Sequence, residues 1–366
     1  MKMQFTLPRE TLLEAVHRVM TVVPNRSETP ILEHVFLRAF DDGQLHLFGN
    51  SLEMEIQAVT ETASGASGMT TVHGRKLHDI LRRLPAGVDV KAVMEDGRLV
   101  LYAGRSRFQL ATLPADNYPH FEIHGERAMV RIQAAALLDV FKNTAYAMGR
   151  NDVRHYLNGV YLRMSGNELT AVATDGHRLA LADAEVGPCE DHEVILPGSA
   201  VGVLMRLLPE LGDVDVTLGD NAARFVFGNL SFSTKLIAAK YPDWTRAVPD
   251  NVRGGFRIDA GELAAAVNRA AVLSNQHCAL KVQVAAGSVH LTASNPESEE
   301  AVEILDAVLE PEDFQAEFGI GADYLTDALG LMDGEVLIQL LGDHYVNRIT
   351  RPGETDRFHI VMPMRL

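Results

Sequence analysis

The chain carries one apolar pattern three times, and this repeat limits the folds that are open to it. Phe5-Thr6-Leu7 is followed by Leu12 and Val16, and equivalent residues return after 125 and then a further 126 positions. The equivalents are Val130, Ile132, Leu137 and Phe141 in the second copy and Phe256, Ile258, Leu263 and Val267 in the third. A period of this length in 366 residues predicts three domains of one fold. Three like domains in turn predict a curved or closed body.

Each copy divides again into two similar halves. A strand is followed by an amphipathic helix, such as the one expected over residues 12–23, and then by strands of alternating apolar residues. A second helix is expected near Leu77, Val201 and Leu325, which are 124 residues apart. The pattern predicts an α+β fold of three repeated domains. Each domain would consist of two β-α-β-β-β halves, which gives six helices in all.

Domain boundaries follow from the repeat. We expect domains at residues 1–126, 127–253 and 254–366, with linkers near residues 125–128 and 250–255. Each domain is large enough to bury a core of its own.

Composition excludes several classes of protein. The apolar stretches are short and broken by charge, so no membrane span is predicted. No signal peptide precedes the first strand, and Cys189 and Cys278 are too few and too far apart for a disulfide framework or a cysteine metal site. We therefore expect a cytoplasmic protein.

Charge is unevenly distributed along the chain. The net charge is −16, which on its face disfavours nucleic acid as a partner. Residues 1–125 carry 13 basic and 15 acidic side chains, whereas residues 251–366 carry 8 and 18, a balance of −10. The three copies therefore present different surfaces, and an acidic exterior is compatible with a basic inner face.

The best candidate for catalysis is the segment Thr174-Asp175-Gly176-His177-Arg178. Asp175 and His177 could form an acid–base pair of a hydrolase. Their spacing matches no common zinc pattern, and the chain lacks nucleotide-binding and nucleophile-elbow motifs. We favour a tight turn in which Asp175 accepts hydrogen bonds from backbone donors.

Two charged groups allow more than one interpretation. The acidic run at residues 295–300, with Glu303, could bind a cation or simply face solvent. The second helix of the first copy carries Arg75, Lys76, Arg82 and Arg83. A basic helix face is often only solvated, but helices at equivalent positions of a curved body could line a concave surface that binds phosphates.

Several segments resemble the bacterial sliding clamp family, the beta subunit of DNA polymerase III. The most specific are ATDGHRLA at residues 173–180 and MPMRL at the C-terminus, and Pro30-Ile31-Leu32, Tyr156-Leu157-Asn158-Gly159 and Tyr241-Pro242-Asp243 also match. They occur in the family order and span essentially the whole chain.

The resemblance implies a head-to-tail homodimeric ring of six like domains, with twelve helices around the hole and the sheets outside. Double-stranded DNA would pass through the hole without sequence-specific contacts. The ring would be a non-enzymatic processivity factor of the DNA polymerase III holoenzyme, with no cofactor and no metal. It would bind the replicative polymerase, the clamp loader and repair and translesion polymerases through short linear motifs. Because the ring is topologically linked to DNA, the negative net charge is not a contradiction.

The resemblance also assigns residues to three sites. The peptide-binding set is Leu157, Thr174, Gly176, His177, Arg178, Leu179, Pro242, Arg246, Ala247, Val346, Val361, Met362, Pro363 and Met364. The DNA-binding set is Arg26, Arg75, Asn151, His155 and Tyr156, with Arg150 and Arg154 as helpers. The dimer interface would join Arg105, Arg107, Phe108 and Leu110 to Val272, Leu273, Glu299, Glu300 and Glu303.

The chain departs from the family pattern at three points. Ala247 and Val346 replace a larger apolar residue and a hydroxyl residue, which predicts a difference in peptide preference. Gly198-Ser199-Ala200 stands where relatives often have basic residues, so a DNA contact from the fourth helix is in doubt. Two other functions are weighed against the clamp: a hydrolase that uses Asp175 and His177, and a scaffold that never contacts DNA.

Overall fold

The computed structural model of the chain describes residues 3–123, 125, 128–275 and 278–365. These residues form two compact units. One contains Met1–Ala135, Val186–His192 and Gly202–Leu236, and the other contains Ala136–Glu185, Glu193–Val201 and Ile237–Leu366. None of the helices within the described ranges is long and apolar enough to span a membrane. The expected boundary at residues 126 and 127 and the last residue of the MPMRL motif, Leu366, lie outside the described residues.

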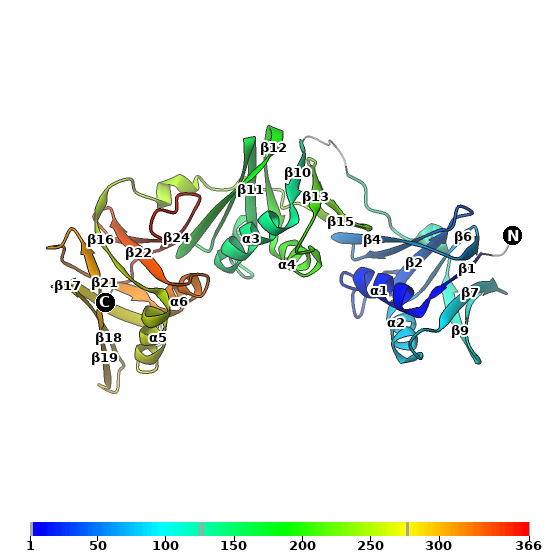
Figure 1. Cartoon of the computed structure of the whole chain (residues 1–366), viewed down its shortest axis with the longest axis horizontal. Coiled ribbons are helices and arrows are strands. Elements are labelled where there is room, and N and C mark those ends of the chain that lie inside the picture. The colour runs from blue at the N-terminus through cyan, green and yellow to red at the C-terminus, as the bar shows by residue number, and fades with distance from the viewer. Residues whose placement is uncertain (1–2, 124, 126–127, 276–277, 366) are drawn as a thin grey trace. The chain divides into compact units, whose positions relative to one another are not determined.

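The first copy consists of two successive β-α-β-β-β halves, as predicted. The first half contains β1 (Gln4–Pro8), α1 (Arg9–Val19), β2 (His34–Ala39), β3 (Gln44–Asn50) and β4 (Met54–Glu61). After the short β5 (Ser64–Ala66), the second half contains β6 (Gly68–His73), α2 (Gly74–Arg83), β7 (Asp89–Glu95), β8 (Arg98–Ala103) and β9 (Ser106–Leu113). The helices α1 and α2 lie side by side against the strands of this copy (Figure 1).

The second copy has the same order with fewer, longer strands. It contains β10 (Ala128–Gln133), α3 (Ala134–Thr144), β11 (Gly159–Thr174), β12 (Arg178–Pro197), α4 (Gly198–Leu207), β13 (Asp213–Leu218), β14 (Ala222–Phe227) and β15 (Leu230–Lys235). The two strands expected on either side of Gly166 form one element, β11. Gly166 has a φ of +63° within it, which fits the turn that was predicted there.

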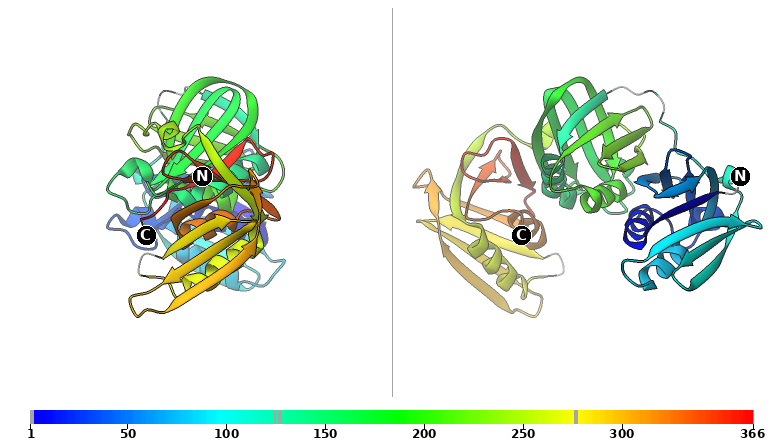
Figure 2. Two further views of the ribbon diagram at one scale, coloured as in Figure 1. Left: turned by 90° about the vertical axis from the view of Figure 1, so that its left-hand side faces the viewer. Right: turned by 45° about the vertical axis from the view of Figure 1, so that its right-hand side comes forward.

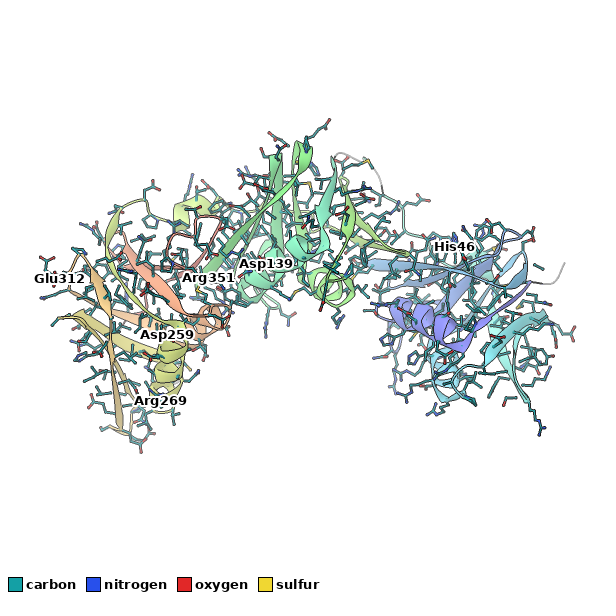
Figure 3. All side chains as sticks on the ribbon, in the orientation of Figure 1. His46, Asp139, Asp259, Arg269, Glu312 and Arg351 are labelled. Atoms are coloured by element: carbon teal, nitrogen blue, oxygen red, sulfur yellow. The ribbon has the colours of Figure 1, made fainter. Side chains whose placement is uncertain are left out.

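The third copy returns to the pattern of the first. It contains β16 (Val252–Asp259), α5 (Ala260–Ala271), β17 (Ala279–Ala285), β18 (Ser288–Ser294), β19 (Glu300–Asp306), β20 (Val308–Glu310), β21 (Ala316–Gly321), α6 (Ala322–Leu329), β22 (Glu335–Leu341), β23 (Val346–Thr350) and β24 (Arg357–Val361). Asp259 caps α5, since its side chain accepts a hydrogen bond from the backbone N–H of Glu262 at 2.9 Å (Figure 3). Helices α5 and α6 again pack side by side (Figure 2).

Strand pairing explains why the central copy contributes to both units. Its strand β15 pairs antiparallel with β4 of the first copy, within a sheet of order β10-β13-β14-β15-β4-β3-β2-β6-β9-β8-β7-β1-β5. Its strand β12 pairs antiparallel with β24 of the third copy, within the order β11-β12-β24-β23-β22-β16-β20. A further sheet has the order β19-β18-β17-β21. Main-chain hydrogen bonds therefore connect the central copy to each of its neighbours.

The combined side-chain volume at two equivalent core positions is the same in all three copies. Phe5 and Val16 are buried in the first copy, and Phe256 and Val267 are buried in the third. In the second copy the large residue is on the helix instead, because Val130 and Phe141 occupy these positions, and both are buried. Each core thus receives one phenylalanine and one valine, as volume-conserving packing requires.

Two expected elements differ in extent from the prediction. The first helix ends at Val19 and not at Val23, although Val22 and Val23 are still buried. Pro24 disfavours helical backbone at Val23, and before it the N–H groups of Thr21 and Val22 donate to the carbonyls three residues back, so the chain leaves the α-helix in a tighter turn. The linker expected at residues 250–255 was wrong in part, because Val252 to Gly255 belong to β16 and pair with β22. Position 254 in β16 requires glycine because the ring of Phe314 occupies the space that a side chain at this position would fill.

Short 3-10 turns complete the chain. They are Pro30–Glu33, Ala115–Asn117, Ala145–Ala147, His155–Leu157 and Trp244–Ala247.

Candidate functional site

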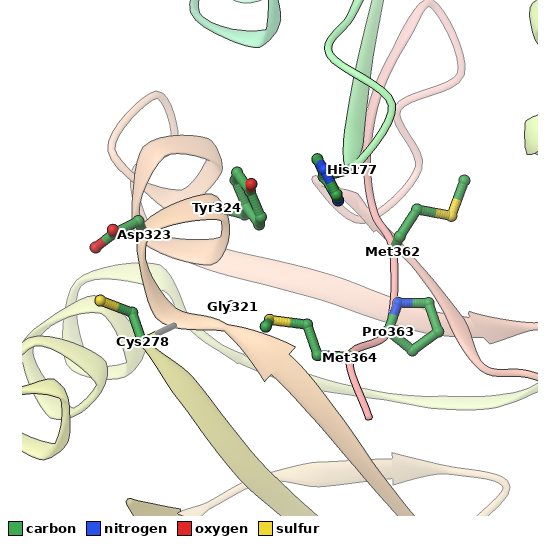
Figure 4. A pocket seen from close by; sticks show the side chains of 8 residues that line it. All are labelled: His177, Cys278, Gly321, Asp323, Tyr324, Met362, Pro363 and Met364. Atoms are coloured by element: carbon green, nitrogen blue, oxygen red, sulfur yellow. The ribbon is translucent and has the colours of Figure 1, made fainter. Parts of the chain in front are cut away.

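A cavity of about 420 Å³ opens in the unit that contains the third copy (Figure 4). Four segments that are distant in sequence form its walls. They are the turn before β12, Cys278 just before β17, the junction of β21 and α6, and the C-terminal segment after β24. The lining residues are His177, Cys278, Gly321, Asp323, Tyr324, Met362, Pro363 and Met364. A mainly apolar cavity with a few polar groups is the usual form of a binding site.

The turn at Asp175 is held by its own side chain. One carboxylate oxygen of Asp175 accepts hydrogen bonds from the backbone N–H of His177 at 2.9 Å and of Arg178 at 3.1 Å. The other oxygen accepts a hydrogen bond from Nε of Arg178 at 3.0 Å. Gly176 has a φ of +92°, which a side chain would disfavour. The predicted turn is therefore confirmed, and both carboxylate oxygens of Asp175 take part in holding it.

Arg178 connects this turn to α6. Its side chain is only 10% exposed, and it forms ion pairs with Asp175 at 3.0 Å and with Asp327 on α6 at 2.5 Å. The guanidinium also lies 5.1 Å from the ring centres of both Tyr146 and Tyr324. Burial opposes the charge, but the hydrogen bond to Asp327 and the charge of Asp175 outweigh it and raise the pKa of Arg178. Arg178 therefore holds the Asp175 turn against α6, and both of these elements contribute residues to the cavity wall.

A second buried pair lies next to Arg178. The hydroxyl of Tyr146 is 2.8 Å from Nδ1 of His359 on β24, and His359 is fully buried. Burial is the main reason that the pKa of Tyr146 is raised and that the pKa of His359 is lowered to about 4. The neutral forms of both side chains are therefore the native ones at neutral pH.

The cavity floor is built by close contacts around Tyr324. The rings of His177 and Tyr324 are stacked, with centroids 5.8 Å apart and planes 7° apart (Figure 4). A side-chain carbon at Gly321 would lie 2.8 Å from the Tyr324 ring and 3.2 Å from the sulfur of Met364. Only glycine leaves this floor open.

Main-chain hydrogen bonds fix the C-terminal segment in the wall. The N–H of Met362 donates to the carbonyl of His177 at 2.9 Å, and the N–H of Met364 donates to the carbonyl of Gly319 at 2.8 Å. The N–H of Ala322 donates to the carbonyl of Cys278 at 2.8 Å, which holds the thiol beside the start of α6. The backbone around the cavity is therefore preorganised.

An apolar cluster continues from the cavity at Met362. Its buried members include Leu179 and Val346, and Ala247, Trp244 and Met362 pack against them. The single tryptophan of the chain, Trp244, thus has a packing role. Pro242 and Arg246 are exposed nearby in sequence, with Arg246 in an ion pair with Asp243 at 3.1 Å.

The structure brings together part of the peptide-binding set expected from the sequence. Four of its members line the cavity, namely His177, Met362, Pro363 and Met364. Leu157 and Val361 are buried, whereas Thr174 shapes the turn through its hydroxyl, which accepts from the N–H of Gly176 at 3.1 Å.

Sequence reasoning missed the other four lining residues, Cys278, Gly321, Asp323 and Tyr324. One signal for Tyr324 was available: Lys76 and Ala200 occupy its position in the other copies, so the aromatic ring is a departure from the repeat.

The residues expected to contact DNA lie in loops and on α2. Arg150, Asn151, Arg154 and His155 are exposed in the segment between α3 and β11, and Tyr156 is half-buried there. The donors of Arg154 are engaged within the chain, with Asp152 at 2.7 Å and with the carbonyl of Asp175 at 3.1 Å. Hydrogen bonds from the side chain and from the backbone N–H of Arg154 lower the pKa of Asp152 to about 2.

In the other unit, Arg26 and Arg75 are exposed, and Arg75 donates to the side chain of Asn25. The remaining basic residues of α2, namely Lys76, Arg82 and Arg83, are exposed as well.

Two strand edges carry the residues expected at the dimer interface. Over residues 106–111 the described pairing partner of β9 is β8, and β19 is the end strand of its sheet. Arg105 and Arg107 are exposed, Phe108 is half-buried and Leu110 is buried. Glu299 and Glu300 are exposed, as is Val272 at 79%, and Leu273 is half-buried. Glu303 already pairs with Arg269 on α5 at 2.7 Å (Figure 3), so its charge is partly compensated within the chain.

No group of three or more His, Cys, Asp or Glu side chains among the described residues is arranged to hold a metal ion. Neither Cys189 nor Cys278 forms a disulfide bond.

Comparison with known proteins decides between the interpretations. Three family models match consecutive parts of the chain: the N-terminal, central and C-terminal domains of the DNA polymerase III beta subunit, at residues 3–122, 131–243 and 245–365. The chain belongs to the DNA polymerase III beta subunit family. The beta sliding clamps of Pseudomonas putida KT2440 and Escherichia coli K12 are 37% and 36% identical to it, with full coverage of both sequences in each case.

Solved structures agree with this assignment. The DNA polymerase III subunit beta from Pseudomonas aeruginosa superposes with a TM-score of 0.95 at 35% identity, over 99% of this chain and 100% of that one. The beta sliding clamp of Caulobacter crescentus superposes with a TM-score of 0.93 at 31% identity, with full coverage of both chains. The chain is therefore a DNA sliding clamp and not a hydrolase. The exact domain boundaries stay predictions.

Proposed function

We propose that two copies of this chain close head to tail into a ring that encircles double-stranded DNA in the cytoplasm. The ring tethers the replicative DNA polymerase and works by effective concentration, since a released polymerase stays near the primer end. The clamp loader and the repair and translesion polymerases bind the same ring. The observation that carries this proposal is the match of three sliding clamp domains, in order, along residues 3–365.

DNA contacts in this proposal are weak and independent of sequence. The exposed basic residues Arg26 and Arg75, and the loop with Arg150, Asn151 and His155, contact phosphates. Tyr156 and Arg154 support that loop. Because the ring cannot leave a closed DNA circle, these contacts need only be strong enough to centre the duplex, and the clamp can slide.

Partner peptides bind in the cavity at His177 and along the adjoining apolar cluster. Flexible methionines, here Met362 and Met364, suit a groove that accepts several peptides in turn. Ala247 and Met362 extend the apolar surface away from the cavity, and they pack on the buried Leu179 and Val346. The ion pair between Arg178 and Asp175 keeps the cavity wall in place when no peptide is bound.

The ring closes where β9 of one protomer meets β19 of its partner. Residues 106–111 of β9 and the length of β19 each have one edge without a main-chain partner among the described residues, and Val272 provides exposed apolar area at the end of α5. Ion pairs of Arg105 and Arg107 with Glu299 and Glu300 add about 0–1 kcal/mol each because they are exposed.

Light scattering after size exclusion tests the dimer. We expect a mass near twice the 40.1 kDa of one chain at micromolar concentration. Val272→Arg should shift the mass toward one chain, because a charge would be buried at the interface. Leu211→Arg is the matched control, since Leu211 is 87% exposed and outside the proposed interface. A stable monomer for the natural chain would overturn the proposal.

The two cysteines offer a direct test of the peptide cavity. Cys278 lines the cavity, and Cys189 lies elsewhere on β12. A nonapeptide selected for binding from a random display library should slow alkylation of Cys278 and leave Cys189 unchanged, as read by peptide mass spectrometry. Equal alkylation of Cys278 with and without saturating peptide would show that the cavity is not the binding site.

A further inference from the structure

The second residue of three equivalent helices differs in charge between the copies. Helices α2, α4 and α6 begin at Gly74, Gly198 and Ala322, which are 124 residues apart, and their next residues are Arg75, Ser199 and Asp323. The repeat therefore places a cation, a neutral side chain and an anion at one structural position. Phosphate binding cannot explain Asp323, because an anion at this position repels DNA.

Asp323 lines the cavity and has no ion pair among the described residues. It is exposed, and the other acidic side chains nearby, Asp175 and Asp327, both pair with Arg178. Among the described residues that line the cavity there is no lysine or arginine. The single carboxylate at its rim is thus available to a ligand (Figure 4).

The net charge of the whole third copy has the same sign as Asp323. Residues 251–366 carry 8 basic and 18 acidic side chains, so the copy that supplies Asp323 is strongly acidic. A field of this sign accelerates the approach of cationic segments and disfavours acidic ones.

We propose that Asp323 selects partner peptides that carry a lysine or arginine beside their apolar anchors. The apolar anchors fill the space between Tyr324, Met364 and the cluster at Met362, and the basic side chain reaches the rim at Asp323. This inference rests on the proposed peptide cavity and adds a charge requirement to it.

The expected preference is modest because the rim is open to solvent. Exposed ion pairs change an equilibrium by about two- to fivefold. We expect selectivity of this size between a basic peptide and its neutral analogue, and we expect it to shrink in high salt, where charges are screened.

Selection from a random nonapeptide display library tests the proposal. Peptides selected on the natural protein should be richer in lysine and arginine than those selected on Asp323→Asn. Asp333→Asn is the matched control, because Asp333 is exposed just after α6 and does not line the cavity. It should select the same peptides as the natural protein.

Affinity measurements then isolate the contribution of the ion pair between Asp323 and the basic residue of the peptide. Replacing the lysine of a selected peptide by norleucine should weaken binding about two- to fivefold on the natural protein and on Asp333→Asn. On Asp323→Asn the same replacement should have no effect. An equal loss on all three proteins, with Cys278 still protected, would overturn this inference and leave the peptide cavity intact. A peptide that binds without protecting Cys278 would instead overturn the proposed cavity.

Discussion

Two arginines contact the same turn, and their different burial makes a sharp prediction. Arg178 is 10% exposed on its side chain and bridges Asp175 and Asp327, whereas Arg154 is 47% exposed and pairs with Asp152. We compare Arg178→Met with Arg154→Met, because methionine keeps most of the side-chain volume and removes the charge. The expected effects on local stability differ several-fold.

The magnitude follows from the contacts. Breaking a buried ion pair costs about 3–5 kcal/mol because the remaining charge loses its partner. The cost at Arg178 is at the lower end, since Asp327 is half-exposed and Asp175 keeps two backbone donors. Loss of the two tyrosine contacts adds about 0.5–1 kcal/mol each. We therefore expect about 4 kcal/mol for Arg178→Met. The loss for Arg154→Met should be much smaller, because its ion pair is exposed.

Hydrogen exchange measures this difference where it occurs. A chain of several domains does not unfold in one step, so local opening is the appropriate quantity. A loss of about 4 kcal/mol corresponds to roughly a 1,000-fold loss of protection for amides of the Asp175 turn and of α6. For Arg154→Met the loss should be less than about fivefold. Equal effects of the two substitutions would refute the assignment of Arg178 as the support of the cavity wall.

Three further results are expected. Gly321→Ala should abolish protection of Cys278 by bound peptide with the fold intact, since its methyl group would displace Tyr324 and Met364 from the floor; unchanged peptide affinity would count against this floor. The pKa of His359 is lowered in the folded chain from an ordinary 6.5 to about 4. Neutral His359 therefore contributes fully to the stability of the folded chain above pH 6.5, and this contribution is lost as the pH falls toward 4. This amounts to about 2 kcal/mol between pH 7 and 5, so thermal unfolding of His359→Phe should depend less on pH in this window, and identical profiles would exclude His359 as the cause. Arg75→Ala should reduce by about one the slope of log affinity against log salt concentration for duplex DNA, and an unchanged slope would remove Arg75 from the DNA contacts.

The repeat made the fold predictable from the sequence. Apolar residues such as Leu12, Leu137 and Leu263 return at fixed intervals, and periodicity of this kind reports directly on which helix face is buried. The merging of two expected strands into β11 was not predictable in this way, since Gly166 has a positive φ as Gly43 and Gly287 do, and these two lie between separate strands. The early end of α1 had a local signal in Pro24, and the prediction did not use it.

The candidate site was predictable only in part because its contacts are long-range. Arg178 and Asp327 are 149 residues apart, and Tyr146 and His359 are 213 apart. No local pattern connects such residues. The resemblance supplied His177 and the C-terminal methionines, because these belong to continuous motifs. Cys278, Asp323 and Tyr324 belong to none, and only folding brings them to the cavity.

The central claim is that the chain acts as a closed ring around DNA, and retention on plasmid DNA tests it most directly. Labelled clamp is loaded on a nicked circular plasmid by the clamp loader of the same cells and separated from free protein by gel filtration. We predict that the clamp stays with the circle for many minutes and leaves once a restriction enzyme makes the plasmid linear. Equal retention on circular and linear DNA, or no retention on either, would contradict the account.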